Sequence, residues 1–315
     1  MRKVLASTMA LCACTPDFDS QTRVHDLRVL AIQAEPPEAI AAIQAGPPGS
    51  PCSGYVEQVQ VTALVVDPGS TGPMSVEGQV CFPTDDGRCG APSVDLPRRA
   101  RPFTPVTCAE GAARPPADVP SYCLQAPPSL ICGALLDDRL HGFGGIRVQL
   151  SLHAYSGDPT RSVWAQKLLV FRAAGTTPNH NPRIDHVEVS RDGVPYDRLE
   201  PGGELFVPDA NVEIGLWPRL APGEEGAETY TTTDLSGRSV ALTESPRYSF
   251  FATDPGDLDR ETGDEPLPGA IPPRGLVRLT ALRPGRGKAW IVVRDERGGE
   301  AWMAFTFCTP GWCGP

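Results

Sequence analysis

The most constraining pattern in the chain is a strict alternation of apolar and polar positions in residues 146–155. The apolar set is Ile146, Val148, Leu150, Leu152 and Ala154. Successive side chains of an extended strand point to opposite faces of a sheet, so a period of two indicates a half-buried β-strand. After the turn SGDP (156–159), residues 163–172 return, and the two runs predict a β-hairpin.

Similar runs recur in both halves of the chain. They cover residues 27–32, 55–66, 74–82, 184–189, 212–216, 228–233, 248–253, 276–282, 289–294 and 301–307. The 35 proline and 32 glycine residues favour frequent turns and argue against long helices. About seven short strand candidates in each half indicate an all-β fold of two tandem immunoglobulin-like β-sandwich domains.

Two stretches interrupt the strand pattern and set the expected boundaries. Residues 82–143 are rich in proline, glycine and charge, and they predict a disulfide-rich insertion in a first domain that spans residues 24–172. Residues 173–182 (AAGTTPNHNP) have no apolar periodicity and predict a linker. The second domain is then expected over residues 183–308, followed by a C-terminal tail of residues 309–315.

The end of the chain carries a family resemblance. Residues 284–307 (PGRGKAWIVVRDERGGEAWMAFTF) resemble the last hairpin of immunoglobulin-like or PKD-like domains of bacterial surface proteins. The resemblance covers one hairpin, and it implies a β-sandwich for the second domain.

The first fourteen residues, MRKVLASTMALCAC, have the layout of a secretory signal, with Arg2 and Lys3 before a short apolar run. The run is too short to span a bilayer as a helix, which takes about 20 residues. Its ending, LCAC, resembles the lipobox of bacterial lipoproteins. This resemblance implies that a signal peptide of residues 1–13 is removed and that Cys14 becomes the acylated first residue, carrying a lipid such as palmitate.

The net charge of the chain and the residue after Cys14 add to this interpretation. Residues 14–23 read as a polar tether between the lipid and the first domain. The formal net charge of −10 disfavours nucleic acid as a partner and anionic lipid headgroups as an attachment surface, so the membrane contact would come from the acyl chains. By the same resemblance, Thr15 after the lipidated cysteine implies an outer-membrane lipoprotein, periplasmic or surface-exposed.

The remaining cysteines indicate an oxidising compartment. With Cys12 removed and Cys14 lipidated, the mature chain keeps Cys52, Cys81, Cys89, Cys108, Cys123, Cys132, Cys308 and Cys313. An even number favours a disulfide framework over unrelated buried thiols, and the absence of a C-x-x-C pair disfavours zinc. The six cysteines of the first domain allow 15 pairings, and their connectivity stays open.

Three of these cysteines allow a more specific expectation. Cys308 and Cys313 enclose a Pro-Gly turn and are expected to pair locally; the alternative is that each pairs with a first-domain cysteine and locks the domains together. Cys81 shares the register of Glu77 and Gln79, so it is expected to point away from the core unless a bulge intervenes.

No recognised catalytic motif is present: there is no G-x-S-x-G, no H-E-x-x-H and no phosphate-binding glycine loop. We therefore expect a structural or protein-binding module without a cofactor, not an enzyme. A hydrolase assembled from distant residues such as His153 and Asp185 is the catalytic alternative. His180 and His186 flank the linker, where a solvated loop is favoured over a metal site.

An acidic loop supplies the candidate metal ligands. Asp257, Asp259 and Glu261 stand at alternate positions, as the oxygen ligands of calcium loops do. Thr262 stands where the calcium template requires glycine, so a solvated charged loop is favoured.

The five tryptophans raise one further alternative, a carbohydrate-binding or adhesive lipoprotein. If Trp164, Trp217, Trp290, Trp302 and Trp312 were exposed on one sheet, they would form a sugar-binding face. Core packing is favoured, and Trp290 and Trp302 are expected to pair across the final hairpin. The expected partner is accordingly an envelope protein or a glycan.

Overall fold

The computed structural model describes residues 20–44, 52–70, 72–84, 88–108, 114–139, 142–157, 160–173, 175, 179–223, 226–234, 236–264 and 276–314. Across these residues the fold is all-β, as predicted, with several sheets and one short helix. The predicted signal peptide and Cys14 lie outside the described residues. No helix in the described ranges has both the length and the apolar character needed to span a membrane.

The first half of the chain forms two sheets that pack face to face. Its elements are β1 (Arg28–Glu35), β2 (Glu38–Gln44), β3 (Ser53–Val56), β4 (Val59–Val66), β5 (Met74–Pro83), β6 (Cys89–Ala100), β7 (Ser121–Leu124), α1 (Pro128–Asp137), β8 (Ile146–Ser156) and β9 (Ser162–Arg172). One sheet has the order β1-β4-β7 and the other β3-β2-β9-β8-β5-β6. Their facing side chains, such as Val61, Val76, Leu150 and Phe171, form one hydrophobic core.

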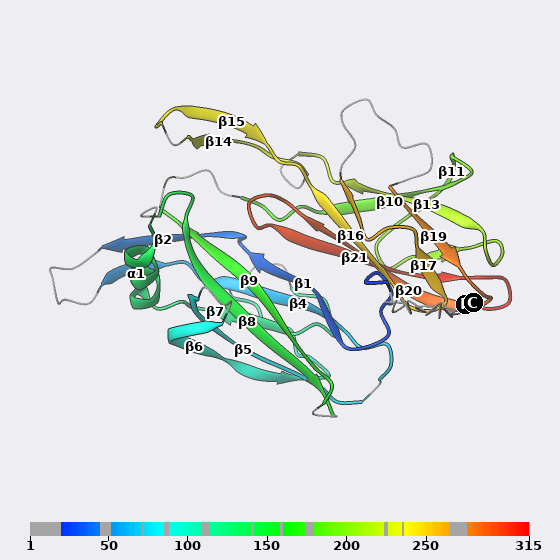
Figure 1. Ribbon diagram of the computed structural model, residues 1–315, viewed down its shortest axis with the longest axis horizontal. Coiled ribbons are helices and arrows are strands. Elements are labelled where there is room, and N and C mark those ends of the chain that lie inside the picture. The colour runs from blue at the N-terminus through cyan, green and yellow to red at the C-terminus, as the bar shows by residue number, and fades with distance from the viewer. Residues whose placement is uncertain are drawn as a thin grey trace, which may run out of the picture.

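The second half repeats this plan. Its strands are β10 (Ile184–Arg191), β11 (Val194–Leu199), β12 (Glu204–Phe206), β13 (Glu213–Leu220), β14 (Thr229–Thr233), β15 (Ser239–Thr243), β16 (Arg247–Ala252), β17 (Gly256–Leu258), β18 (Thr262–Asp264), β19 (Val277–Ala281), β20 (Arg286–Arg294) and β21 (Glu300–Cys308). Sheets of order β11-β10-β13-β19-β17 and β12-β21-β20-β16-β18 enclose a second core, which includes Ile214, Phe250 and Phe305. The β14–β15 hairpin projects from this half (Figure 1).

The segment 82–143 has more regular structure than its composition suggests. β6 pairs with β5, β7 pairs with β4, and α1 carries buried residues such as Leu130 and Ile131. Most of this segment is therefore part of the sandwich and not an insertion outside it. β6 is an edge strand that contains two prolines and the exposed Arg98. Such residues protect a sheet edge from pairing with another strand, and they also interrupt the alternating pattern in the sequence.

Four disulfides join all eight cysteines of the predicted framework. The pairs are Cys52–Cys132, Cys81–Cys89, Cys108–Cys123 and Cys308–Cys313. The last pair is local, as expected, and each of the eight cysteines bonds within its own half. Cys81 is fully buried beneath its bond to Cys89, beside a shift in the β5–β6 register.

β4 differs from the half-buried strand that the sequence predicts, because all eight of its residues are buried. Val61 and Val65 face the first core. Leu64 and Val66 face a separate cluster with Trp290 and Val292 of β20. The second half therefore covers the outer face of the β1–β4 sheet, and the two sandwiches share an apolar junction (Figure 1).

The N-terminal segment also crosses this junction. The Val24 amide donates to the Ala252 carbonyl of β16, and the Ala252 amide donates to Thr22; both bonds are 2.9 Å long. Arg23 lies 3.0 Å from Asp257. Thr22, Arg23 and Val24 are therefore bound to the second half, so the end of the predicted tether packs against the folded chain.

Candidate functional site: the cleft between the two halves

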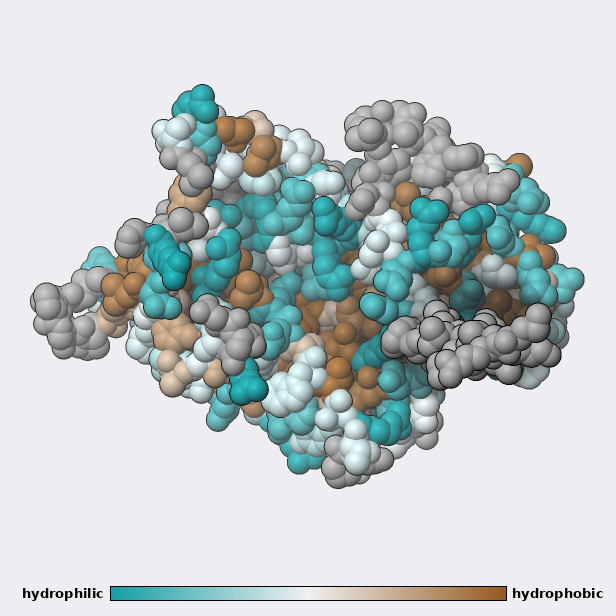
Figure 2. Space-filling model, viewed as in Figure 1, coloured by the Kyte–Doolittle hydropathy of each residue, from teal (hydrophilic) through white to brown (hydrophobic). Residues whose placement is uncertain are grey.

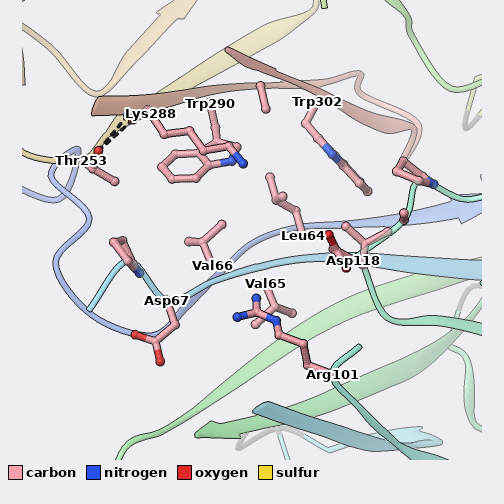
Figure 3. A pocket seen from close by; sticks show the side chains of 15 residues that line it. Leu64, Val65, Val66, Asp67, Arg101, Asp118, Thr253, Lys288, Trp290 and Trp302 are labelled. Carbon is pink, nitrogen blue, oxygen red and sulfur yellow. Dashed lines mark hydrogen bonds between the residues drawn. The ribbon is translucent and has the colours of Figure 1, made fainter. Parts of the chain in front are cut away.

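A cleft of about 640 Å³ opens at the junction, where β4 faces the β20–β21 hairpin (Figure 3). The first half contributes Leu64, Val66, Asp67, Arg101 and Asp118, and the second half contributes Lys288, Trp290 and Trp302. Figure 2 shows hydrophobic surface gathered in the groove between the halves. The cleft exists only while the two halves remain packed together.

The two tryptophans share one face of the final hairpin. Trp290 pairs in register with Ala304, and Val292 pairs with Trp302, so the indoles are diagonal neighbours and not direct cross-strand partners. Trp290 is buried and Trp302 is partly exposed. The opposite face of these strands fills the second core, which fixes both backbones and directs the indoles towards the first half.

Charged groups surround this apolar floor. The Lys288 ammonium lies 5.6 Å from the centroid of the Trp290 ring, and the Lys288 backbone is held by hydrogen bonds to Thr253. Arg101 and Asp118 approach from the first half (Figure 3). Asp118 lies in a turn and adopts φ 65°, a left-handed conformation that aspartate enters more readily than most non-glycine residues.

The charges in the cleft are not equivalent. The Asp67 carboxylate is already paired with Arg161 at 2.6 Å. For Lys288 and Arg101, no side-chain ion pair is found among the described residues. The cleft thus combines the partly exposed Trp302 indole with two cationic side chains and the Asp118 carboxylate. Positive charge remains in excess among these three charged groups, so the lining suits a ligand with an apolar group and a carboxylate.

A buried ionic cluster fixes the junction at a second place. Arg297, in the β20–β21 turn, contacts Glu38 of β2, Glu228 and Glu244. Arg172 of β9 also lies 2.7 Å from Glu38. Each carboxylate of this cluster is nearly inaccessible to solvent, so its charge depends on the arginines.

Burial and neighbouring negative charges raise the pKa values of two carboxyl groups in and beside this cluster. Burial, with repulsion from Asp295 and Glu228, raises the pKa of Glu244 to about 7. Burial also raises the pKa of Asp295. The His180 Nδ1 lies 2.5 Å from Glu228 Oε1, and the Tyr230 ring stacks on the Arg297 guanidinium at 4.5 Å. The linker and the β14–β15 hairpin therefore both join the cluster.

Glu300 of β21 forms a second ionic link. Its carboxylate contacts Arg294 at 2.7 Å, Lys167 of β9 at 3.2 Å and the Ile32 amide of β1 at 3.3 Å. The Asn181 side chain donates to the Ala34 carbonyl and accepts from the Glu300 amide. Residues 179–181 are thus bound between the halves, in contrast to the solvated linker that the sequence favours.

The candidate calcium ligands have other partners. Asp257 pairs with Arg23, and Asp259 lies 2.9 Å from Arg278. Glu261 is exposed, and its carbonyl accepts from the Phe250 amide. Within the described ranges, no group of three His, Cys, Asp or Glu side chains is arranged to hold a metal ion.

The other candidate residues are dispersed. His153 stacks on Trp164 in the first half, whereas Asp185 pairs with His186 and Arg198 in the second. The structure does not bring His153 and Asp185 together as a catalytic pair. The tryptophans lie on β9, β13, β20, β21 and the C-terminal segment, so they do not form one common face.

Sequence reasoning missed Lys288, Arg101, Asp118 and Arg297. Their positions in strand ends and turns are also typical of solvated charges. No local pattern distinguishes a charged residue that lines a site from one that faces solvent. The one available signal is the run Leu64-Val65-Val66, which is apolar on both faces of its strand.

Comparisons with known proteins show little similarity. No protein-family model matches the chain, and no curated protein matches it significantly. Among solved structures, a transglutaminase from red sea bream aligns with 90% of this chain and 32% of its own, at 10% identity and a TM-score of 0.23. That score carries no argument about function.

Proposed function

We propose that the protein is an exported, lipid-anchored envelope protein that binds a partner polypeptide in the cleft between its halves. The resemblance of LCAC to a lipobox supports acylation of Cys14. The four disulfides support an oxidising compartment. The outer membrane is the proposed location, with the module acting by binding and not by catalysis.

The observation that carries the binding proposal is the cleft lining. Trp302 offers apolar area beside the buried Trp290, while Lys288 and Arg101 offer positive charge from opposite halves. An extended segment with an aromatic or aliphatic side chain next to an acidic one satisfies both features. The acidic chain as a whole repels anionic polymers, so the local positive charge selects for a short acidic motif.

The anchor is tested by labelling cells with a fatty acid. The Cys14→Ser variant is expected to lose the label and to escape normal processing, whereas Cys12→Ser is expected to keep both. Several acyl chains anchor a protein firmly, so the labelled wild type is expected in the membrane fraction. Labelling of Cys14→Ser at the wild-type level would disprove the anchor.

The cleft is tested by site-specific photo-crosslinking. A photoreactive residue at Trp302 is expected to give an adduct of defined size in intact cells. The same residue at Leu242, an exposed position on β15, serves as the control. The adduct should disappear when Lys288→Glu and Arg101→Glu are combined. An adduct that forms equally at both positions, or that survives the charge reversal, contradicts the proposal.

A further inference from the structure

The outer face of the six-stranded sheet carries an aromatic and polar arrangement unrelated to the cleft. Glu77 of β5, His153 of β8 and Trp164 of β9 are paired in register and form one row across three strands. Because residues two apart on a strand share a face, the neighbouring row is Gln79, Ser151 and Gln166. Carboxylate, amide and aromatic side chains therefore lie side by side on this face, with Ser151 buried between the two glutamines.

Trp164 is held in a fixed orientation although it is 60% exposed. Its ring stacks on the His153 ring, with centroids 4.3 Å apart and planes inclined by 8°. The imidazole supports one face of the indole and leaves the remaining surface to solvent. An exposed indole whose position is already fixed loses little side-chain entropy when a ligand covers it.

A depression of about 300 Å³ adjoins this stacked pair. Glu77 and Asp95 line it with carboxylates, and Gln79 lines it with an amide. Gly78 lies between Glu77 and Gln79, and a Cβ there would lie 2.5 Å from the Ser151 carbonyl oxygen and 2.6 Å from the Leu152 side chain, so the close approach of β5 to β8 at this point requires glycine. The Glu77 carboxylate accepts from the Tyr155 hydroxyl at 3.4 Å and lies 3.5 Å from His153, so its position is also fixed.

We propose that this face binds a neutral saccharide, with one sugar ring stacked on Trp164 and its hydroxyls bonded to Glu77, Gln79 and Asp95. A sugar ring has an apolar C–H face that can pack on an indole, and neighbouring hydroxyls that can donate to carboxylates. The two carboxylates repel anionic sugars and nucleic acid. The rows of hydrogen-bonding groups favour a sugar over an apolar peptide.

This site is independent of the proposed function. Its residues belong to β5, β6, β8 and β9, whereas the cleft lies at the junction with the second half. Loss of saccharide binding therefore leaves crosslinking at Trp302 intact, and loss of the cleft partner leaves saccharide binding intact.

The test uses the purified chain without its signal and three neutral probes: cellohexaose, chitohexaose and xylohexaose. Calorimetric titration is expected to show binding of at least one probe at concentrations up to about 10 mM, the weak range typical of shallow sites. The Trp164→Ala variant should bind at least about tenfold more weakly, and Glu77→Ala should also lose affinity. Trp312→Ala, which removes another exposed tryptophan, should bind as the wild type does.

Three results overturn the proposal: no probe binds, Trp164→Ala binds as tightly as the wild type, or Trp312→Ala loses as much affinity as Trp164→Ala. Because Trp164 is exposed, its variant is expected to fold, and an unchanged thermal midpoint confirms this. The Trp164→Phe variant should retain part of the affinity, because phenylalanine keeps an aromatic face.

Discussion

Arg297 in the β20–β21 turn donates a hydrogen bond to Glu38 of β2, and both side chains are almost completely buried. The two residues belong to different halves of the chain. Taking two charges out of water is costly, and the cost is offset only while both partners stay together. This pair therefore makes the packing of the halves specific.

The Arg297→Met variant should be strongly destabilised. It leaves Glu38, Glu228 and Glu244 buried without their shared cation, and breaking a buried ion pair in this way costs about 3–5 kcal/mol. Urea unfolding measures the loss. Arg238→Met, which removes an exposed partner of Asp234, is the matched control and should change little. Equal midpoints for the two variants would show that the cluster contributes nothing.

The raised pKa of Glu244 predicts a pH dependence. Between about pH 4.5 and 7 the folded chain keeps the Glu244 proton while the unfolded chain releases it, so this group's contribution to stability is complete below pH 4.5 and is lost as the pH rises to about 7. The thermal midpoint of the wild type should therefore fall relative to that of Glu244→Gln over this range.

The control for Glu244 is Glu213→Gln, which changes an exposed partner of Arg278. The difference between wild type and Glu213→Gln should stay constant over the same pH range. A constant difference between wild type and Glu244→Gln would mean that the pKa of Glu244 is the same in the folded and the unfolded chain.

The disulfides should differ in their contributions to stability. Cys52–Cys132 closes 80 residues and Cys308–Cys313 closes five. Loop-closure entropy then predicts about 4.5 kcal/mol for the first and about 2 kcal/mol for the second. Denaturation of the two double Cys→Ala variants measures this order. If the Cys308/Cys313 variant loses more stability than the Cys52/Cys132 variant, the Cys308–Cys313 bond stabilises parts of the fold beyond the C-terminal segment.

Sequence periodicity is most informative where one face of a strand meets solvent. The alternation in residues 146–155 and 163–172 predicts β8 and β9, because each strand has an apolar core face and a polar outer face. It is less informative for β4, where Gln60 and Thr62 are buried although their polarity suggests exposure. The pattern of neighbouring residues in a strand carries no information about a second layer that packs on its outer face. Here that layer comes from residues more than two hundred positions away in the sequence.

The local sequence pattern also fails to predict which charged residues are buried. Arg297 lies in the run DERGGE, which reads as a solvated hairpin turn, and the turn itself is predicted correctly. Its burial depends on Glu38, Glu228 and the linker meeting at one place in the folded chain. The functional cleft arises in the same way, because its tryptophans and its cations come from strands that meet only after both halves have folded.

The most direct test of the fused two-half architecture is a single cut in the linker. A protease recognition sequence is inserted after Gly175, an exposed residue where an added Cβ would meet no atom within 4 Å, and the purified protein is cleaved in native buffer. We predict that the two pieces co-elute as one particle on gel filtration. In denaturant without reductant they should separate, because all four disulfides lie within one half or the other. Pieces that elute separately in native buffer would contradict the account.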